Sequence, residues 1–298
     1  MSTGAGWPIG VIGTGLMGTV CGRRLLAAGH QVIGYDVDPA ALARFASTGG
    51  ETSASLSGLM QSCSYFVLAV FDTTQVEDII EGPQGLLALA PKDADPLVVA
   101  CVSTCDPDRI ASLVARIPAG RMHFVEAPIS GTSEQTLQGE GLGLLGGELS
   151  AVQTAEPMIA AICPRRHHVG PAGSGARAKL GINLILGVNR AALAEGLVFV
   201  ERMGLDATAF LAVARESAAF SQIMDVKGLT MLKGDFSARG KITQSQKDFQ
   251  LIQAQAARLK QRLPLADTYA DLVQKCVESG EGELDNSVVI QEIRRRIL

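Results

Sequence analysis

A glycine-rich turn directly after a short apolar run is the part of this chain that most clearly suggests a chemistry. The run Ile9-Gly10-Val11-Ile12 leads into Gly13-Thr14-Gly15-Leu16-Met17-Gly18, and a helix-compatible stretch extends from Met17 to Ala28. Glycines at this spacing allow a tight turn, close approach of the backbone to phosphates and close packing of helix on strand. The helix N-terminus adds amide donors and a positive dipole. The turn therefore predicts a site for a dinucleotide pyrophosphate.

A carboxylate at the end of the next strand-like run indicates which dinucleotide this is. The run Gln31–Tyr35 ends in Asp36, 18 residues after Gly18. A carboxylate there binds the adenosine ribose hydroxyls and repels a 2′-phosphate, so we expect NAD as the cofactor. The alternative is an ordinary glycine turn and a solvated Asp, and the order of strand, turn, helix and carboxylate disfavours it.

Lys179 and Asn183 are the strongest candidates for proton transfer. They are four residues apart in a long, mostly apolar helical stretch, so their side chains share one face. Burial disfavours an ammonium ion and lowers its pKa towards the working pH, where Lys179 can exchange a proton with a substrate hydroxyl. Asn183 could hold that lysine or the reacting oxygen. The residues alone equally allow a surface lysine and an asparagine bonded to its own backbone.

A second cluster of donors lies in Ser130-Gly131-Thr132. These residues follow a strand-like run, so we expect them at the carboxyl edge of the sheet, where open α/β sheets bind ligands. Two hydroxyls and nearby backbone amides suit a substrate carboxylate. A hydroxyl-rich turn without a function is the alternative.

The elements that must position these residues alternate first and are helical afterwards. Further strand-like runs are Tyr65–Val70, Leu97–Val102, Met122–Val125 and Leu142–Leu145. Helical stretches at Ala40–Ala46, Thr74–Ile80, Pro107–Ile117 and Ala151–Cys163 lie between or after them. This alternation predicts a Rossmann-type α/β fold with a doubly wound parallel sheet.

The second part of the chain predicts an all-α domain. A long interdomain helix is expected from Ala176 to Met203, with Gly204 as its stop. Four more helices are expected at Ala207–Arg215, Gln246–Lys260, Leu265–Glu278 and Ser287–Arg295, and no strand. We therefore predict a nucleotide-binding domain over residues 1–170 and an all-helical substrate and dimerisation domain over residues 171–298.

Composition and charge exclude several classes of protein. The chain has 298 residues, enough for two domains, and a net charge of −4 without a long basic run, so nucleic acid is not an expected partner. Apolar stretches are interrupted by Gly, Asn or charge before about 18 residues, so no membrane span is expected. The N-terminus lacks the pattern of a signal peptide. We therefore expect a cytoplasmic protein.

No metal site is expected. The six cysteines lie mostly in apolar runs, and Cys101-x-x-x-Cys105 lacks a second pair of ligands, so reduced thiols are the simplest interpretation. His167 and His168 precede a glycine loop without other ligands nearby in the sequence. Cys105 is expected to be a neutral thiol that fills space, rather than a nucleophile.

Four segments in register resemble one family. The glycine turn is followed by Glu126-Ala127-Pro128-Ile129-Ser130-Gly131-Thr132, by Gly173-x-Gly175-x-x-x-Lys179-x-x-x-Asn183, and by Lys247-Asp248-Phe249. This arrangement resembles the β-hydroxyacid dehydrogenases, which include 3-hydroxyisobutyrate dehydrogenase and tartronate semialdehyde reductase. The resemblance covers nearly the whole chain.

The resemblance implies roles for particular residues. Lys179 matches the family's catalytic acid/base and Asn183 its assistant, while Ser130, Gly131 and Thr132 match the segment that holds the substrate's acid group. Ser103-Thr104 matches a pair beside the nicotinamide, of which Thr104 is the better candidate. Val70, Phe71 and Gln75 match a loop over the cofactor, Lys247 matches a lysine that reaches the cofactor, and Asp248 is expected to position polar groups near the substrate.

Two departures from the family pattern affect these expectations. Thr132 stands where many members have a second glycine, which puts the substrate's identity in doubt. Val70-Phe71 replaces a Leu-Pro pair, which leaves the rigidity of that loop open.

The implied activity is NAD-dependent interconversion of a small β-hydroxyacid and its semialdehyde or keto acid. The alternatives are an imine reductase of the same architecture and a non-catalytic NAD-binding module. Imine reductases generally replace the catalytic lysine with Asp or Tyr, so Lys179 disfavours the first. A homodimer or homotetramer is expected because the long helix has more than one apolar face.

Overall fold

The computed structural model describes residues 6–297. Residues up to Lys179 form one compact unit and residues from Leu180 onwards form a second. This division into compact units lies inside helix α9 (Ser174–Arg202). The reason is that the first turns of α9 are hydrogen-bonded to the sheet of the first unit, through Glu126 and Ile129.

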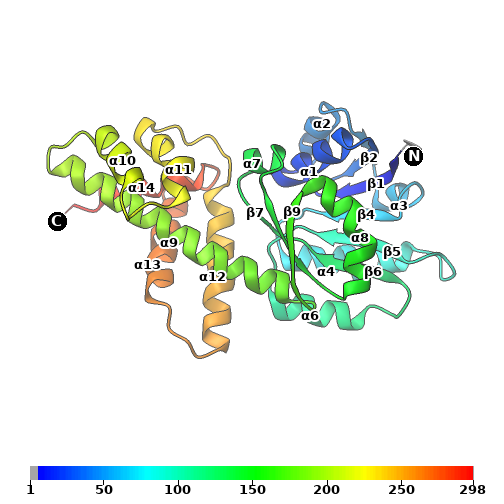
Figure 1. Ribbon diagram of the computed structural model, residues 1–298. Helices are drawn as coiled ribbons and strands as arrows, with labels where there is room; N and C mark the ends of the chain where they lie inside the picture. The colour runs from blue at the N-terminus through cyan, green and yellow to red at the C-terminus, as the bar shows by residue number, and fades with distance from the viewer. Residues whose placement is uncertain (1–5, 298) are drawn as a thin grey trace. The chain divides into compact units, whose positions relative to one another are not determined.

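A twisted, mostly parallel sheet forms the centre of the first unit (Figure 1). Its strands are β1 (Gly6–Ile12), β2 (His30–Tyr35), β3 (Glu51–Thr52), β4 (Tyr65–Leu68), β5 (Leu97–Cys101), β6 (Met122–Glu126), β7 (Ile129–Ser130), β8 (Leu142–Gly146) and β9 (Arg165–Gly170). The strand order is β3-β2-β1-β4-β5-β6-β8-β7, and β9 pairs with β8. All neighbours from β3 to β6 are parallel, whereas β8 is antiparallel to β6 and β7. The predicted Rossmann-type fold is confirmed, with an antiparallel addition at one side.

Helices cover both faces of this sheet because its strands are apolar on both sides. One face packs against α1 (Leu16–Ala27), α2 (Pro39–Ala46) and α8 (Leu149–Ile162). The other packs against α3 (Leu56–Met60), α4 (Thr73–Glu81), α5 (Leu86–Leu89) and α6 (Pro107–Arg116). Within β4, Val67 points to the first face, whereas Phe66 and Leu68 point to the second. Because β1 to β6 are parallel, the ends of these strands and the loops after them lie at one edge of the sheet.

Strand β9 was not predicted, because its residues do not resemble a buried strand. Arg165, His167 and His168 are exposed, and the strand pairs only with β8. An edge strand buries little side-chain surface, so it needs no apolar pattern. Its backbone hydrogen bonds with β8 determine its conformation.

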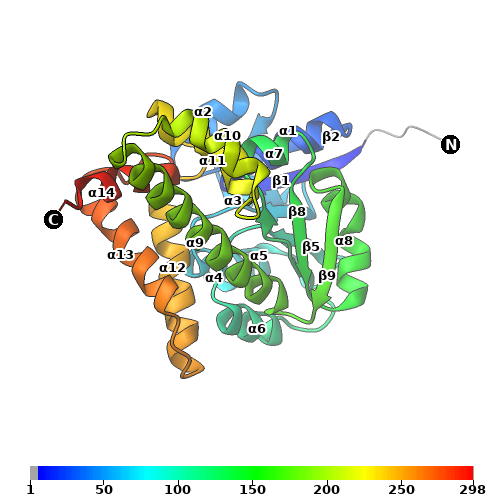
Figure 2. The same ribbon diagram turned by 60° about the vertical axis from the view of Figure 1, so that its left-hand side comes forward.

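The second unit is helical, as predicted. It contains the remainder of α9, then α10 (Ala207–Glu216), α11 (Gln222–Lys233), α12 (Ile242–Arg258), α13 (Pro264–Glu278), the 3-10 turn η1 (Asn286–Val288) and α14 (Val289–Arg295). No strand follows Gly170 in residues 6–297. Helices α12 and α13 run side by side (Figure 2), and buried Leu197, Phe249, Tyr269 and Ile290 belong to one core.

Helix α11 was missed because only part of its buried face is apolar. Lys227, Gly228 and Thr230 are buried together with Met224 and Met231. A Cβ on Gly228 would lie 2.7 Å from a methyl carbon of Leu211, so the glycine lets α11 approach α10 closely. Polar and glycine positions on the inner face remove the apolar periodicity on which a helix prediction depends.

Helix α9 is the one helix within residues 6–297 that is long and apolar enough to cross a membrane, by length and composition only. Of its most apolar 18-residue window, 33% is buried inside the protein. One such helix is weak evidence for a membrane span, since core helices of soluble proteins meet the same criterion.

Candidate active site

The glycine turn between β1 and α1 has the geometry that phosphate binding requires. Gly13 has φ +88°, and a Cβ there would lie 2.6 Å from the carbonyl oxygen of Ala69. A Cβ on Gly18 would lie 1.8 Å from the carbonyl oxygen of Gly13. Both glycines are therefore needed for packing. A Cβ on Gly15 would meet nothing within 4 Å, so this side of the turn is open.

The N-terminus of α1 suits an anion. Gly15 is the N-cap residue and offers no side-chain hydrogen bond to the first turn, which also contains no acidic residue. Leu16 is 43% exposed, and Met17 is half-buried. Uncapped amides and an open approach at Gly15 fit a dinucleotide pyrophosphate.

Asp36 is hydrogen-bonded to the glycine turn. Its Oδ2 accepts the backbone N–H of Thr14 at 2.6 Å and the Thr14 hydroxyl at 3.2 Å, and its Oδ1 accepts the N–H of Asp38 at 2.9 Å. Thr14 itself is buried. The sequence placed both residues near the cofactor but did not predict this bond, which keeps the carboxylate beside the turn.

Two side-chain hydrogen bonds order the loop that lacks the family's proline. The Gln75 Oε1 accepts the N–H of Phe71 at 2.8 Å, and the Ser103 hydroxyl donates to the carbonyl of Val70 at 2.7 Å. Phe71 is 48% exposed, whereas Thr104, next to Ser103, is buried. The loop after β4 and the loop after β5 therefore contact each other.

Cys101 and Cys105 lie beside that second loop and are both buried. A hydrogen bond with Cys105, together with burial, raises the pKa of the Cys101 thiol well above its ordinary value. A thiol that stays neutral is a poor nucleophile. Within the described residues, no group of three His, Cys, Asp or Glu side chains has the arrangement of a metal site.

Thr132 begins helix α7 (Ser133–Leu137) with a reciprocal capping box. Its hydroxyl accepts the N–H of Gln135 at 3.1 Å, and its own N–H donates to the Gln135 Oε1 at 2.9 Å. The preceding Gly131 has φ +142°, a conformation that favours glycine. The expectation that backbone amides here serve a carboxylate must therefore exclude the Thr132 amide. Because the Thr132 hydroxyl oxygen is the acceptor in this capping bond, its O–H can donate to another group.

Lys179 lies in the second turn of α9, with its side chain against β7. Its Nζ donates to the carbonyl oxygen of Ile129 at 2.7 Å, and the residue is only 9% exposed. Ile129 directly precedes Ser130. The structure thus brings the predicted acid/base next to the segment predicted to hold the substrate's acid group.

Asn183, Lys247 and Asp248 lie together in the second unit. The Asn183 Nδ2 donates to Asp248 Oδ2 at 2.7 Å, and Lys247 Nζ lies 3.3 Å from Asp248 Oδ1. Lys247 and Asp248 are both buried. Because Asn183 uses an N–H for Asp248, its carbonyl oxygen is directed elsewhere as an acceptor.

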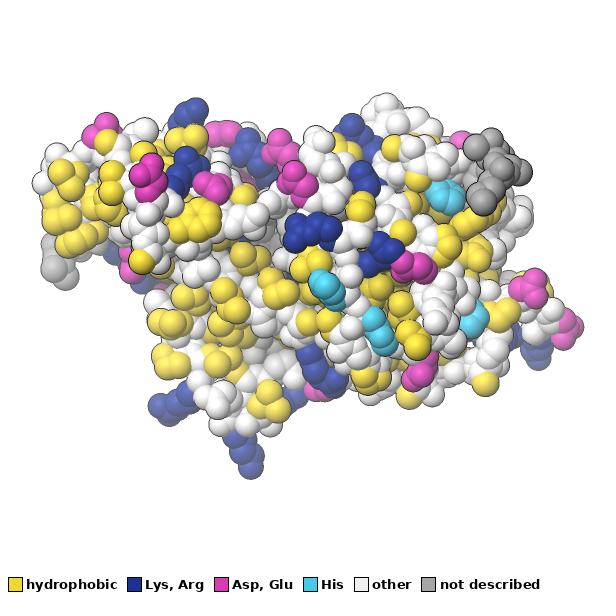
Figure 3. Space-filling model, in the orientation of Figure 1, with side chains coloured by type: hydrophobic (Ala, Val, Ile, Leu, Met, Phe, Trp, Pro, Cys, Tyr) yellow, Lys and Arg dark blue, Asp and Glu magenta, His cyan; other side chains and the backbone are white. Residues whose placement is uncertain are grey.

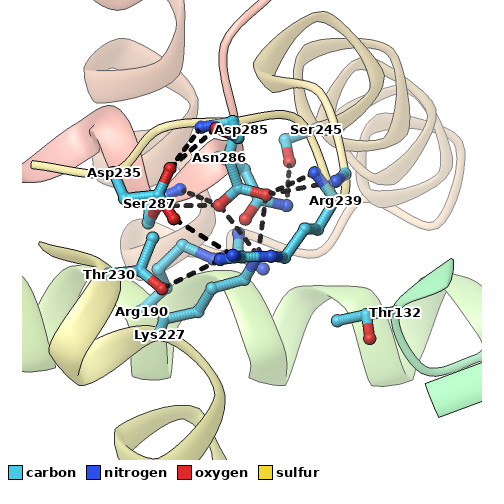
Figure 4. Close-up of polar contacts among 12 residues, drawn as sticks. Thr132, Arg190, Lys227, Thr230, Asp235, Arg239, Ser245, Asp285, Asn286 and Ser287 are labelled. Atoms are coloured by element: carbon cyan, nitrogen blue, oxygen red, sulfur yellow. Dashed lines mark hydrogen bonds and ion pairs between the residues drawn. The ribbon is translucent and has the colours of Figure 1, made fainter. Parts of the chain in front are cut away.

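A buried ion pair that the sequence did not reveal supports the segment before α12 (Figure 4). Both carboxylate oxygens of Asp285 lie 2.8 Å from Lys227 Nζ. Its Oδ2 also accepts the N–H groups of Arg239 and Gly240, and its Oδ1 accepts the N–H and hydroxyl of Ser287. Burial alone would raise the pKa of Asp285, but Lys227 and Ser287 outweigh it and hold that pKa below its ordinary value.

Comparison with known proteins identifies the families of both parts of the chain. Residues 8–170 match the family described as the NAD binding domain of 6-phosphogluconate dehydrogenase. Residues 173–293 match the family described as NAD-binding of NADP-dependent 3-hydroxyisobutyrate dehydrogenase.

Individual relatives match over almost their whole length. An L-threonate dehydrogenase of Cupriavidus necator is 31% identical over 95% of this chain and 95% of its own. A 2-hydroxy-3-oxopropionate reductase of Escherichia coli is 27% identical over 96% of each chain. The crystal structure of a 3-hydroxyisobutyrate dehydrogenase from Salmonella typhimurium has a TM-score of 0.85 at 25% identity, covering 96% of this chain and 99% of that one.

Proposed function

This chain belongs to the β-hydroxyacid dehydrogenase family, and we propose that it uses NAD to interconvert a small β-hydroxyacid and its semialdehyde or keto acid. Its relatives are named dehydrogenases and reductases, so it is an oxidoreductase by family. The observation that carries the more specific proposal is the buried Lys179 amine, which is hydrogen-bonded to the carbonyl of Ile129, the residue before Ser130. This contact supports a role for Lys179 in proton transfer, because the segment that follows Ile129 carries the Ser130 and Thr132 hydroxyls.

The glycine turn and Asp36 are the proposed cofactor site. The amides at the start of α1 hold the pyrophosphate, and Asp36 holds the ribose hydroxyls. Val70, Phe71, Gln75 and Thr104 line the nicotinamide end in this proposal, and Lys247 also binds the cofactor, because it matches the family's cofactor-binding lysine. When bound, the nicotinamide supplies the hydride chemistry that no side chain can provide.

The protein's own residues handle the substrate and its proton. Ser130, Gly131 and the Thr132 hydroxyl bind the substrate carboxylate. Lys179 takes the proton of the substrate hydroxyl in the oxidation direction and returns it in reduction. Asn183, oriented by Asp248, holds the lysine or the reacting oxygen by a hydrogen bond.

A substrate panel tests this function. Small β-hydroxyacids and their semialdehydes, including threonate-like sugar acids, are assayed by NADH absorbance. Turnover of a member of this class supports the proposal. Turnover of cyclic imines alone would favour an imine reductase, and tight NAD binding without any turnover would favour a binding module.

The choice of NAD over NADP is tested by Asp36→Asn. Two unit charges 4 Å apart repel by about 1 kcal/mol even in water, so the Asp36 carboxylate should disfavour a 2′-phosphate by about five-fold or more. The substitution keeps an oxygen for the Thr14 amide. We expect the ratio of kcat/KM for NAD to that for NADP to fall by at least that factor. A wild-type protein that prefers NADP would contradict the assignment.

We also propose that the helical unit assembles into a homodimer or homotetramer. Ile185 and Phe199 on α9 are 58% and 64% exposed, and Met203, directly after the helix, is 56% exposed. Apolar side chains are visible on the surface of that unit in Figure 3. A second copy of the chain would remove this surface from water.

Sedimentation velocity tests the assembly. We expect a species larger than the 31.2 kDa monomer at micromolar concentration, and Phe199→Glu should shift it towards the monomer. Leu149, 57% exposed on α8, provides the control, and Leu149→Glu should leave the assembly unchanged. A wild-type protein that sediments only as a monomer would rule out the assembly.

A further inference from the structure

Glu126 is a buried carboxylate to which no role has been assigned. It ends β6 and is only 3% exposed. Its Oε2 accepts the N–H of Gly173 at 2.5 Å and its Oε1 accepts the N–H of Ala176 at 2.9 Å. These amides lie at the start of α9, where helical N–H groups lack partners within the helix. A strand residue 47 positions earlier in the chain therefore caps the helix that carries Lys179.

The Glu126 side chain occupies space that is open only because two neighbouring residues are glycines. A Cβ on Gly146 would lie 2.4 Å from the Glu126 Oε2, and a Cβ on Gly175 would lie 3.0 Å from the Glu126 Cβ. Burial raises the pKa of Glu126, while the N–H groups of Ala176, Gly173 and Gly175 and the charge of Arg177 oppose the increase. The helix dipole favours a negative charge at this place.

The same segment contacts α9 a second time through Lys179. Three residues after Glu126, the carbonyl oxygen of Ile129 accepts the hydrogen bond from Lys179 Nζ. The Glu126 carboxylate determines where α9 begins relative to β6. The Ile129 carbonyl accepts the hydrogen bond from Lys179, which lies one to two turns further along the helix. All of these contacts lie within the first unit.

We propose that Glu126 is a positioning residue, which holds the start of α9 so that Lys179 reaches the Ile129 carbonyl beside Ser130. Its importance for turnover rests on the proposed function, in which Lys179 is the acid/base. Its effect on the position of Lys179 does not depend on that function. A displacement of about 1 Å at a reacting group can cost about 100-fold in rate.

The first test measures the position of Lys179 without using activity. Glu126→Gln keeps the shape of the side chain, but its NH2 group would face an N–H donor of α9. In the full-length protein with NAD, we expect faster hydrogen exchange in the peptide that contains residues 173–176. We also expect several-fold faster acetylation of Lys179 by an amine-reactive ester, measured by peptide mass spectrometry. Unchanged exchange and acetylation would overturn the proposal.

Two variants make this test specific. Glu126→Asp keeps the charge but is one methylene shorter, so its acetylation rate should lie between those of the wild type and Glu126→Gln. This variant also serves if Glu126→Gln does not fold. Asp206→Asn alters a carboxylate that caps α10 by accepting the N–H of Thr208, and it should leave Lys179 unchanged. If Asp206→Asn increased the acetylation rate of Lys179 as much as Glu126→Gln does, the effect would not be specific to Glu126 and the proposal would be wrong.

Kinetics then separate this proposal from the proposed function. With a substrate identified by the panel, Glu126→Gln should lower kcat by about 10- to 100-fold and leave the KM for NAD unchanged. If acetylation increases and kcat does not fall, Glu126 positions Lys179 without importance for turnover, and the kinetic part of the proposal is wrong. If Lys179→Ala itself remains active, the proposed function fails, while exchange and acetylation still decide the role of Glu126.

Discussion

Replacing Lys179 with Met should reduce kcat by about 100- to 10,000-fold, the usual contribution of a positioned acid or base. Methionine fills a similar space without a titratable group, so the loss reports proton transfer rather than a cavity. Lys179→Arg should fail almost as severely, because a guanidinium cannot give up its proton near neutral pH. NAD affinity, measured by fluorescence titration, should stay close to the wild-type value.

Two controls accompany this prediction. Lys233 is an exposed lysine at the end of α11, and Lys233→Met should retain the wild-type kcat. Asn183→Ala should have a smaller effect than the Lys179 variants, because it removes a hydrogen-bonding group and leaves the acid/base in place. If Lys179→Met retained more than about a tenth of the wild-type kcat, the loss would be smaller than the usual contribution of an acid or base. Lys179 would then not be the catalytic group.

The second large effect is expected on stability, from Asp285→Leu. Removing this carboxylate leaves the buried Lys227 without its counter-charge and removes the acceptor of three backbone N–H groups. Breaking a buried ion pair in this way typically costs about 3–5 kcal/mol. Urea denaturation followed by circular dichroism should therefore show a much lower midpoint. Lys227→Met should be milder, since Asp285 then keeps its backbone donors.

The pH dependence of stability provides an independent check. The folded-state pKa of Asp285 is lower than its ordinary value, so its contribution is present above about pH 4, the unfolded pKa of Asp. This contribution is lost as the pH falls through the lower folded-state pKa. Glu278→Gln, in an exposed pair with Lys275, is the control and should change stability little. Equal acid sensitivity of the wild type and Asp285→Leu would contradict the assignment.

The sequence by itself was sufficient for the fold class and for the family. Short apolar runs that alternate with helical stretches predicted the main strands, and the Gly13–Gly18 turn predicted the nucleotide site, because these are local patterns. The Thr132 capping box is also local, since a Thr followed three residues later by Gln is visible in the sequence. Its use of the Thr132 amide could therefore have been anticipated.

Only the tertiary structure revealed the contacts that position the site. Glu126 meets the start of α9 from 47 or more residues away, and Lys227 meets Asp285 across 58 residues. The bond between Thr14 and Asp36 and the polar buried face of α11 depend equally on distant partners. Residue type and spacing describe what one element can form by itself. Which buried charge meets which amide depends on how the chain packs, because burial makes such a group costly unless a partner from another segment satisfies it.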